Sequence, residues 1–322
     1  MQVISKGLIV GMILMLAGFL SGNGAFAAYP EKPITIAVGF SAGGSTDQIC
    51  RAIGAVVEKS LGQPVVVINK PGGGGTIAAS WVKTKRPDGY NLVAMTPAVI
   101  VGELTKKVPY DIVNDFTHIM RFSGYVHGIG SKAGQPWNDL KGFIDYAKKN
   151  PGKLTAGAPG KGSLPYLAVA QLSDVCGIKL KQIPYKGGTK QMAAMLGGHL
   201  DTYNGPLIFL PHVDNGAVNF LAIYADERLE DYPDVPTVRD VGYDVIAPAP
   251  LGISAPANLP AETLEILQEA FKKAMQDPSV IKTCKKFQMP MSYEDSSSFS
   301  QTVKQTLDYY GAIAVKIGMK IQ

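Results

Sequence analysis

The stretch GFSAGGSTDQ, residues 39–48, places two adjacent glycines, three hydroxyls and a carboxylate between an alternating apolar run and a helical pattern. The glycine pair leaves backbone N–H groups uncovered, and Ser45, Thr46 and Asp47 stand where the helix would begin. Unpaired N–H groups and the positive end of the helix dipole make such a junction a possible anion site. An ordinary strand-to-helix turn with a good N-cap has the same composition, so both interpretations stay open on these residues alone.

A second glycine-rich junction, GAPGKGSLP, occupies residues 157–165. Lys161 in this stretch would add a full positive charge, although lysines are more often solvated. The stretch does not fit the phosphate-binding pattern G-x-x-x-x-G-K-[ST], because Gly162 follows the lysine. If the two junctions belong to different α/β units that face one another, they could hold one anion between two helix N-termini.

A third glycine-rich stretch, NKPGGGGTIAAS, covers residues 69–80. Four consecutive glycines give a backbone that can line a cleft closely, as a lid or rim, or that simply forms a mobile turn.

Patterns typical of catalysis or of metal binding are missing from the sequence. The four histidines lack metal-binding spacing, and the chain contains no G-x-S-x-G elbow and no C-x-x-C pair. The three cysteines are too few for a disulfide framework, so we expect buried thiols; Cys50 and Cys284 could bridge if the two ends of the chain share a domain. We therefore expect binding without chemistry, and neither a cofactor nor a metal.

Short apolar runs alternate with helical patterns along the chain, which predicts an α/β protein with largely parallel sheets. Residues 34–38, 65–68 and 92–95 read as strands, and the helix from Asp47 carries apolar residues at three- and four-residue spacing. Ligands of such sheets lie at the carboxyl ends of the strands, where both junctions fall. A second α/β unit follows, and after a proline-rich stretch two more amphipathic helices are predicted around 264–275 and 299–317.

The first 27 residues predict export. Lys6 precedes an uncharged apolar run, 7–20, that is followed by the small-residue sequence Ala25-Phe26-Ala27, as in a secretory signal peptide cleaved before Ala28 or Tyr29. The apolar run is shorter than a retained membrane anchor needs. We therefore expect a soluble periplasmic protein.

Length and charge narrow the class further. The 322 residues exceed the usual size of one domain, which favours two. The chain has 31 basic and 26 acidic side chains, a mild excess without a basic run dense enough for nucleic acid. A modest positive surplus suits small anions.

Several blocks follow one another along the mature chain: YPEKPITIAVGFSAGGSTD, LGQPVVVINKPGGGGTIAAS, PDGYNLVAMTP, GAPGKGS, PYKGGTKQMAAMLGGHLD and DVPTVRDVGYD. In order and spacing they resemble the Bug receptors, the periplasmic solute-binding proteins of tripartite tricarboxylate transporters. The resemblance implies a type II periplasmic-binding-protein fold, in which two α/β lobes joined by two crossing strands close on a small carboxylate. It places lobe 1 at residues 28–124 and 250–322 and lobe 2 at residues 125–249, after the signal peptide at 1–27.

The resemblance also implies a set of ligand-binding residues in the first junction, in the facing loop of the second lobe and after the block GGHLD. Carried over to this chain, they are Phe40, Ser41, Gly44, Ser45, Thr46, Asp47, Ala158, Gly160, Lys161, Gly162, Ser163, Tyr203 and Asn204.

Two departures from the family pattern bear on the ligand. A rigid diproline of most relatives is replaced by Ser41-Ala42, and an acidic residue of many relatives is replaced by Tyr203 before Asn204. The tyrosine could stack on an apolar ligand body or fill the core of its lobe. Because the acid that would pair with a ligand ammonium is missing, we expect a mono- or dicarboxylate without an amine.

The expected function is capture of a small organic carboxylate and its delivery to the membrane permease subunits of a tripartite tricarboxylate transporter. We expect a monomer that is not an enzyme and binds no nucleic acid. A related alternative sends the liganded protein to a sensor kinase. An alternative from another class is an exported hydrolase or transferase with a glycine-rich oxyanion site.

Overall fold

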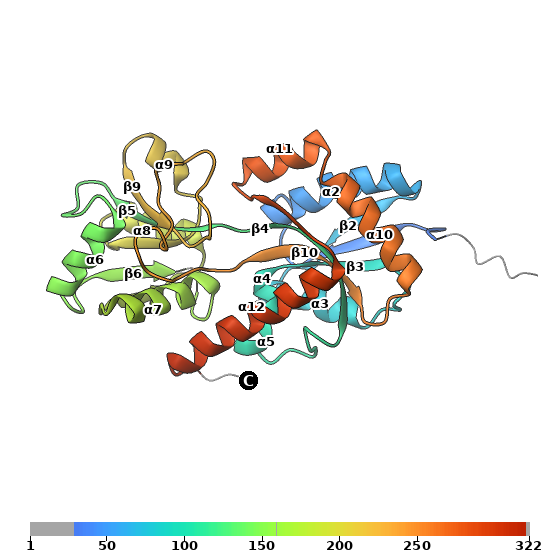
Figure 1. Ribbon diagram of the computed structural model, residues 1–322, viewed down its shortest axis with the longest axis horizontal. Coiled ribbons are helices and arrows are strands. Elements are labelled where there is room, and N and C mark those ends of the chain that lie inside the picture. The colour runs from blue at the N-terminus through green and yellow to red at the C-terminus, as the bar shows by residue number, and fades with distance from the viewer. Residues whose placement is uncertain (1–28, 159, 320–322) are drawn as a thin grey trace, which may run out of the picture.

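The chain folds around two separate β-sheets, each flanked by helices on both faces (Figure 1). The computed structural model describes residues 29–158 and 160–319, and the signal peptide predicted over residues 1–27 lies outside them. Two extended segments connect the sheets, one directly after β4 and one directly before β10 (Figure 1). The two-lobed α/β architecture predicted from the sequence is confirmed.

The first sheet has six strands in the order β11-β4-β10-β3-β1-β2. Strands β1, β2 and β3 are parallel, whereas β10 is antiparallel to both β3 and β4, so β4 runs in the same direction as the first three. The strands are β1 (Ile34–Val38), β2 (Val65–Asn69), β3 (Asn91–Met95), β4 (Phe116–Gly124), β10 (Pro250–Pro256) and β11 (Met291–Glu294).

The second sheet has five strands in the order β7-β6-β8-β5-β9. Strand β5 is antiparallel to its neighbours β8 and β9, and β6 is parallel to β7 and β8. The strands are β5 (His127–Lys132), β6 (Thr155–Ala158), β7 (Lys181–Pro184), β8 (Thr202–Pro206) and β9 (Val218–Ile223).

The prediction of largely parallel sheets is wrong, because both sheets are mixed. The chain leaves the first sheet along β4 and must return to it, and the returning strand β10 pairs antiparallel beside β4. In the second sheet, the strand that brings the chain in from the first lobe, β5, is likewise antiparallel to its neighbours β8 and β9.

Strand direction determines which loops of the two lobes face each other. Because β4 carries the chain out of the first sheet at its C-terminal end, the C-terminal ends of β1, β2 and β3 lie at the same edge, toward the second lobe. Strand β5 enters the second sheet at its N-terminal end, so the C-terminal ends of β6, β7 and β8 lie toward the first lobe. The glycine-rich junctions after β1 and after β6 therefore lie at facing edges.

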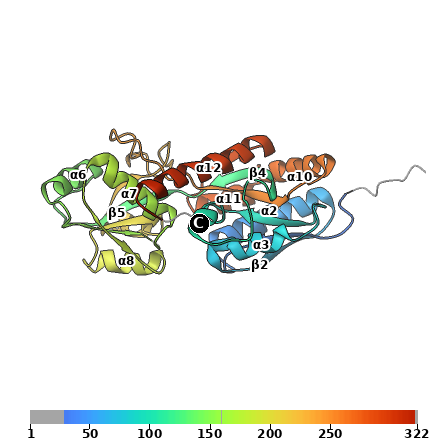
Figure 2. The same ribbon diagram turned by 90° about the horizontal axis from the view of Figure 1, so that it is seen from below.

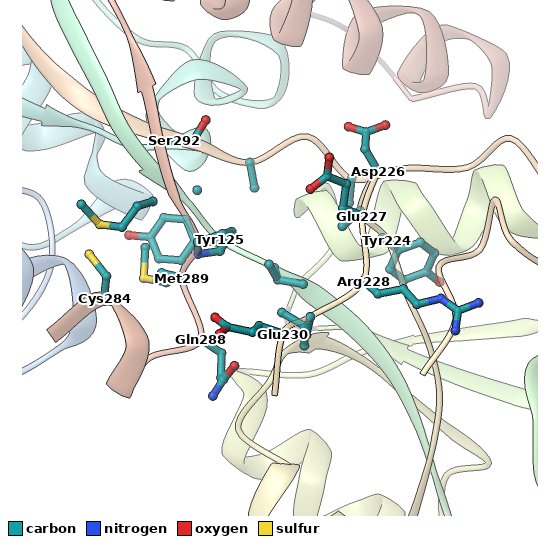
Figure 3. A pocket seen from close by; sticks show the side chains of 18 of the residues that line it. Tyr125, Tyr224, Asp226, Glu227, Arg228, Glu230, Cys284, Gln288, Met289 and Ser292 are labelled. Carbon is teal, nitrogen blue, oxygen red and sulfur yellow. The ribbon is translucent and has the colours of Figure 1, made fainter. Parts of the chain in front are cut away.

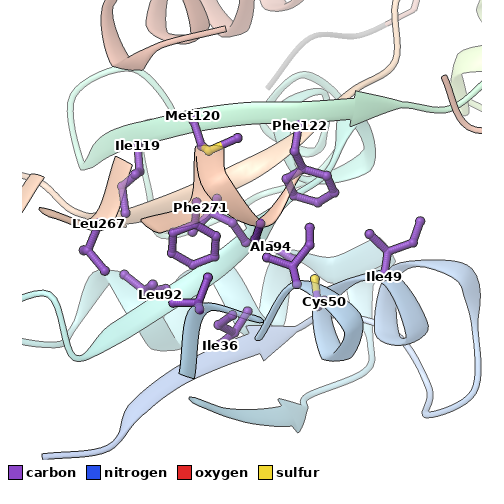
Figure 4. Packing of buried hydrophobic residues seen from close by; sticks show 14 of the residues in the cluster. Ile36, Ile49, Cys50, Leu92, Ala94, Ile119, Met120, Phe122, Leu267 and Phe271 are labelled. Carbon is purple, nitrogen blue, oxygen red and sulfur yellow. The ribbon is translucent and has the colours of Figure 1, made fainter. Parts of the chain in front are cut away.

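The core of the first lobe has a layer on each face of its sheet. On one face, α2 (Ser45–Leu61), α10 (Ala261–Ala274) and α11 (Pro278–Lys286) bury Ile49, Leu267 and Phe271 against strand residues such as Ile36 and Leu92 (Figure 4). Each such side chain contributes about 1.5–3 kcal/mol by leaving water. The other face is covered by α3 (Thr76–Lys83), α4 (Pro97–Ile100) and α12 (Ser296–Lys316).

The second lobe is layered in the same way. Helices α6 (Leu140–Lys149) and α7 (Leu164–Cys176) pack on one face of its sheet, and α8 (Gly188–Leu196) and α9 (Leu210–Asp214) pack on the other. The three cysteines of the chain are buried and unbridged in the cores of the two lobes.

Helix α12 starts on the first lobe and ends beside α7 of the second (Figures 1 and 2). The hydroxyl of Tyr309 donates to Gln171 Oε1 over 2.6 Å, and Lys316 forms an ion pair with Asp174. The hydroxyl of Tyr310 donates to the carbonyl of Pro248, in the second connecting segment, over 3.1 Å. The last helix thus contacts both lobes and the connection between them. In residues 29–158 and 160–319, no helix is both long and apolar enough to cross a bilayer.

Candidate functional site

The first junction presents a helix N-terminus without a side-chain cap. Helix α2 begins at Ser45, and its N-cap is Gly44, whose lack of a side chain leaves the first N–H groups of the helix without a capping acceptor. The sequence also allowed an ordinary turn in which a hydroxyl or carboxylate of this loop caps the helix. The structure shows no such side-chain cap at α2. Ser41 and Gly44 are exposed, whereas Thr46 and Asp47 in the first turn of the helix are buried.

Asp47 is turned inward and organises the loop. It is 2% exposed, and its carboxylate accepts from the Gly43 N–H and from Asn69 Nδ2, each over 2.8 Å, and pairs with Arg51 over 3.0 Å. Burial opposes ionisation, but the hydrogen bonds from Arg51, Gly43 and Asn69 outweigh it and hold the pKa of Asp47 below its ordinary value. These contacts are internal, and a direct contact of Asp47 with a ligand stays a prediction.

Thr46 connects the first junction to the segment between the lobes. Its hydroxyl lies 2.6 Å from the hydroxyl of Tyr125, in the connection from β4 to β5. Thr46 is buried, and burial raises the pKa of Tyr125, so the phenol stays neutral. The backbone N–H of Tyr125 donates to Ala249 in the other connecting segment over 2.9 Å. The start of α2 is therefore linked, through Tyr125, to both segments that connect the two lobes.

The second junction begins where β6 ends at Ala158. Ser163 is the N-cap of α7, and its Oγ accepts from the Tyr166 N–H over 3.3 Å, so the capping role is real for this residue. Lys161 is exposed. A Cβ added at Gly162 would lie 3.3 Å from Cγ2 of Thr105, which belongs to α5 (Gly102–Thr105) of the first lobe. The second junction therefore lies against the first lobe.

The third glycine-rich stretch packs against the first junction. A Cβ at Gly39 would lie only 2.3 Å from the Cα of Gly75, and the Phe40 ring lies over Gly75. Residues 72–75 all adopt positive φ, which favours glycine at each of them. This stretch forms part of the same facing edge, which agrees with the rim alternative of the sequence analysis.

A hydrophobic cluster between the lobes holds the two junctions near each other. Tyr125 packs against this cluster, and its hydroxyl contacts Thr46 at the start of α2. The buried members of the cluster are Val101, Leu164, Leu167, Ala249, Tyr310 and Ile313.

Tyr203 and Asn204 lie inside the second lobe. Tyr203 is fully buried, and its hydroxyl donates to the carbonyl of Pro206 over 2.9 Å. Asn204 donates to the carbonyl of Gly157 over 3.2 Å and accepts from the Tyr224 hydroxyl over 2.8 Å. The alternative in which Tyr203 fills the core of its lobe matches this packing, and ligand contacts of both residues stay predictions.

A cavity of about 680 Å³ opens between the lobes, next to β11 and the loop after β9 (Figure 3). Tyr125 lines it, but none of the residues implied by the family resemblance does. Its basic side chains are engaged by acids, in the pairs Arg121–Glu294, Arg228–Asp240 and Lys285–Asp231. Glu227 and Glu230 also line it, and within the described ranges neither forms an ion pair. Because the remaining charge is negative, this cavity is a poor site for a carboxylate.

Two residues that sequence reasoning missed lie at the facing edges. Tyr125 stands in the unremarkable run FSGYVHG, which carries no signal of its contact with Thr46. Thr96, at the end of β3, is 1% exposed, and its Oγ1 finds no hydrogen-bond partner among the residues that the structure describes. A buried hydroxyl without a partner is uncommon in folded proteins.

Comparison with known families decides the class. The model of the tripartite tricarboxylate transporter family receptor, TctC, matches residues 49–319. The chain belongs to this family. The receptor is therefore a member of a family of periplasmic solute-binding proteins rather than of an enzyme family.

Relatives of the receptor support the same assignment. A Cupriavidus necator protein, described as a UPF0065 protein in the gbd 5' region, is 35% identical over 291 residues, which cover 90% of this chain and 89% of that protein. The periplasmic binding protein BugD is 28% identical with a TM-score of 0.74, over 91% of this chain and 100% of BugD. MatC from Rhodopseudomonas palustris, solved with bound malate, is 26% identical with a TM-score of 0.72, over 88% and 99%. The type II periplasmic-binding-protein fold predicted from the sequence is confirmed.

Proposed function

We propose that the receptor captures a small organic carboxylate without an amine between its two lobes and delivers it, unchanged, to the membrane permease subunits of a tripartite tricarboxylate transporter. The observation that best supports this function is the position of the two glycine-rich junctions at facing edges of the two sheets. We further propose that lobe 1 comprises residues 28–124 and 250–322 and lobe 2 residues 125–249, and that the mature protein is a periplasmic monomer.

An anion fits this place for electrostatic reasons. Helix α2 directs uncapped N–H groups at the facing edge, and each helix dipole that points at an anion contributes about 0.3–2 kcal/mol. The glycine-rich stretches 39–48, 69–80 and 157–165 contain Lys70 and Lys161, and their one acidic residue, Asp47, is engaged by Gly43, Asn69 and Arg51. The malate bound by MatC, at 26% identity, supports a carboxylate as the ligand class.

We propose a ligand without an amine because the two junctions contain no free carboxylate that could pair with an ammonium group. The carboxylate of Asp47 is already engaged by Gly43, Asn69 and Arg51. No other carboxylate occurs in residues 39–48 or 157–165. A ligand ammonium would therefore lose its water shell without gaining a counter-ion.

The contacts proposed for the ligand are the backbone and hydroxyls of the first junction, Phe40 to Thr46, and of the second, Ala158 and Gly160 to Ser163. The N–H groups at the start of α2 would donate to one carboxylate, and Lys161 would approach from the second lobe on closure. Tyr125 positions Thr46 through their hydroxyl contact.

The first test uses receptor purified from the periplasm of an expression host and unfolded and refolded to remove any bound ligand. Its thermal denaturation is followed with a panel of mono-, di- and tricarboxylates, aromatic acids and amino acids. A ligand at a hundredfold excess over its Kd stabilises the folded state by about 2.7 kcal/mol, which shifts the melting temperature by several degrees. Stabilisation by amino acids alone, or by no carboxylate, contradicts the proposal.

Two further measurements separate the receptor from its alternatives. Chromatography of the ligand after long incubation should recover it unchanged, whereas a hydrolase or transferase would give product. Uptake of the radiolabelled ligand should fall in cells that lack the receptor, whereas a protein serving only a sensor kinase would leave uptake intact. N-terminal sequencing should begin at Ala28 or Tyr29.

A further inference from the structure

The ammonium group of Lys106 lies on the third glycine-rich stretch. Its Nζ donates a hydrogen bond to the carbonyl of Gly73 and lies 2.9 Å from the position that a Cβ at Gly74 would occupy. An ammonium has three N–H donors, so two remain after this bond.

Lys106 is an exposed residue whose ammonium group is only partly shielded from water and forms no ion pair with the described residues. Burial lowers the pKa of Lys106, and among the described residues no carboxylate opposes this effect. Some lysines of the first lobe do have a carboxylate partner: Lys83, for example, pairs with Asp115 over 2.7 Å. A cation without a counter-ion gains from an anion placed beside it.

The position of Lys106 is between the glycine-rich loops. The preceding residue, Thr105, contacts Gly162 of the second junction. The stretch that Lys106 caps packs through Gly75 against Gly39 and Phe40 of the first junction. The lysine is therefore held at the edge that faces the second lobe, separate from the start of α2.

We propose that Lys106 binds a second carboxylate of the ligand, whose first carboxylate is held at the start of α2, and that it makes the receptor selective for dicarboxylates over monocarboxylates. This inference rests on the proposed function. Two separate sources of positive potential, a helix N-terminus and an ammonium, match an anion with two charged ends. The site on the first junction alone would not distinguish succinate from propionate by charge.

The test measures the affinities of the receptor for succinate, L-malate, propionate and L-lactate by calorimetry. The variants are Lys106→Met, Lys106→Arg and, as the matched control, Lys107→Met, which removes the same charge from the adjacent residue, likewise exposed. We expect Lys106→Met to weaken the dianions at least tenfold more than the monoanions. Lys106→Arg should keep most of the dianion affinity, and Lys107→Met should change neither class by more than about twofold.

The outcomes separate this inference from the proposed function. The role of Lys106 is overturned if the unaltered receptor binds monoanions more tightly than dianions, or if Lys106→Met loses equal affinity for both. Neither result contradicts carboxylate capture. A Lys107→Met effect as large as that of Lys106→Met also overturns it, because the effect would then be general charge. An unaltered receptor that binds no carboxylate at all overturns the proposed function itself. The unliganded melting temperature of each variant shows whether the fold is kept, and Lys106→Arg keeps the test valid if Lys106→Met unfolds.

Discussion

The hydroxyls of Thr46 and Tyr125 lie 2.6 Å apart, one in the first turn of α2 and the other in the segment that connects the two sheets. The ring of Tyr125 also packs against the cluster that contains Leu164 and Leu167, from the start of α7. One side chain therefore contacts the first turn of α2 and packs against the cluster between the lobes. Tyr125 lies in one of the segments that connect the lobes, so any rotation of one lobe against the other would move this segment.

Replacing Tyr125 by Phe should weaken both folding and ligand binding. The change removes the hydroxyl contact and leaves the buried Thr46 Oγ without its partner, at a cost of about 1 kcal/mol in the free energy of unfolding. Urea denaturation and calorimetry measure the two effects. The cycle of Tyr125→Phe with Thr46→Val should give a coupling energy of at least about 0.5 kcal/mol. Additive effects would show that the two hydroxyls do not interact.

Replacing Ser163 by Ala should remove the N-cap of α7. Loss of such a cap costs about 1 kcal/mol, which lowers the melting temperature by a few degrees in a protein of this size. Ser300→Ala on the exposed side of α12 serves as the control and should change the melting temperature little. If Ser163→Ala weakens ligand binding and leaves the melting temperature unchanged, the hydroxyl acts on the ligand rather than on the helix.

Replacing Asp47 by Asn should loosen the first junction. The amide keeps the shape of the side chain, but it loses the negative charge opposite Arg51 and one of the two acceptors that hold Gly43 and Asn69, so we expect a loss of about 2 kcal/mol. Asp145→Asn removes an exposed partner of Lys141 and should cost well under about 1 kcal/mol. Urea denaturation compares the two. Equal losses would mean that the Asp47 contacts contribute no more than a surface pair.

Two buried histidines should make the receptor less stable in mild acid. Burial lowers the pKa of both His118 and His127 to about 4, whereas an unfolded histidine titrates near about 6.5. As the pH falls below 6.5 the unfolded chain takes up these protons first. The free energy of unfolding should therefore decline from about pH 6.5 to about pH 4, and the contribution of these groups is constant above and below that window.

His127→Gln tests this explanation, because the amide does not titrate. The decline between pH 6.5 and pH 4.5 in urea denaturation should become smaller in this variant. His199→Gln changes an exposed histidine and should leave the decline as it is in the unaltered receptor. A decline of the same size in all three proteins would exclude His127 as its cause.

The sequence predicted those parts of the fold that depend on local patterns. Strands 34–38 and 92–95 and the helix from the first junction agree closely with β1, β3 and α2, because alternating or three- and four-residue spacing directly reflects one buried face. Helix α11 was not predicted, since it is short and buries only Val280 and Cys284. The direction of β10 also escaped prediction, because pairing between distant strands leaves no local pattern.

The candidate site was predictable only in part. Glycines and hydroxyls at a strand-to-helix junction indicate backbone exposure, so both junctions could be named from the sequence. The inward orientation of Asp47 depends on Asn69 and Arg51, and the burial of Tyr203 depends on the packing of its lobe. Tyr125 and Lys106 reach the edge through contacts with residues far away in the chain, which a reading of local patterns does not detect.

The place of β10 in the first sheet has a consequence for the order in which the two lobes can fold. β10 lies between β4 and β3, so the six-stranded sheet lacks a central strand until residue 256 has emerged. The five-stranded sheet has all of its strands once residue 223 has emerged. When the chain emerges from its N-terminus, the lobe encoded in the middle of the gene can fold first. The first lobe, which is formed by both ends of the chain, completes its sheet only when β10 and β11 have emerged.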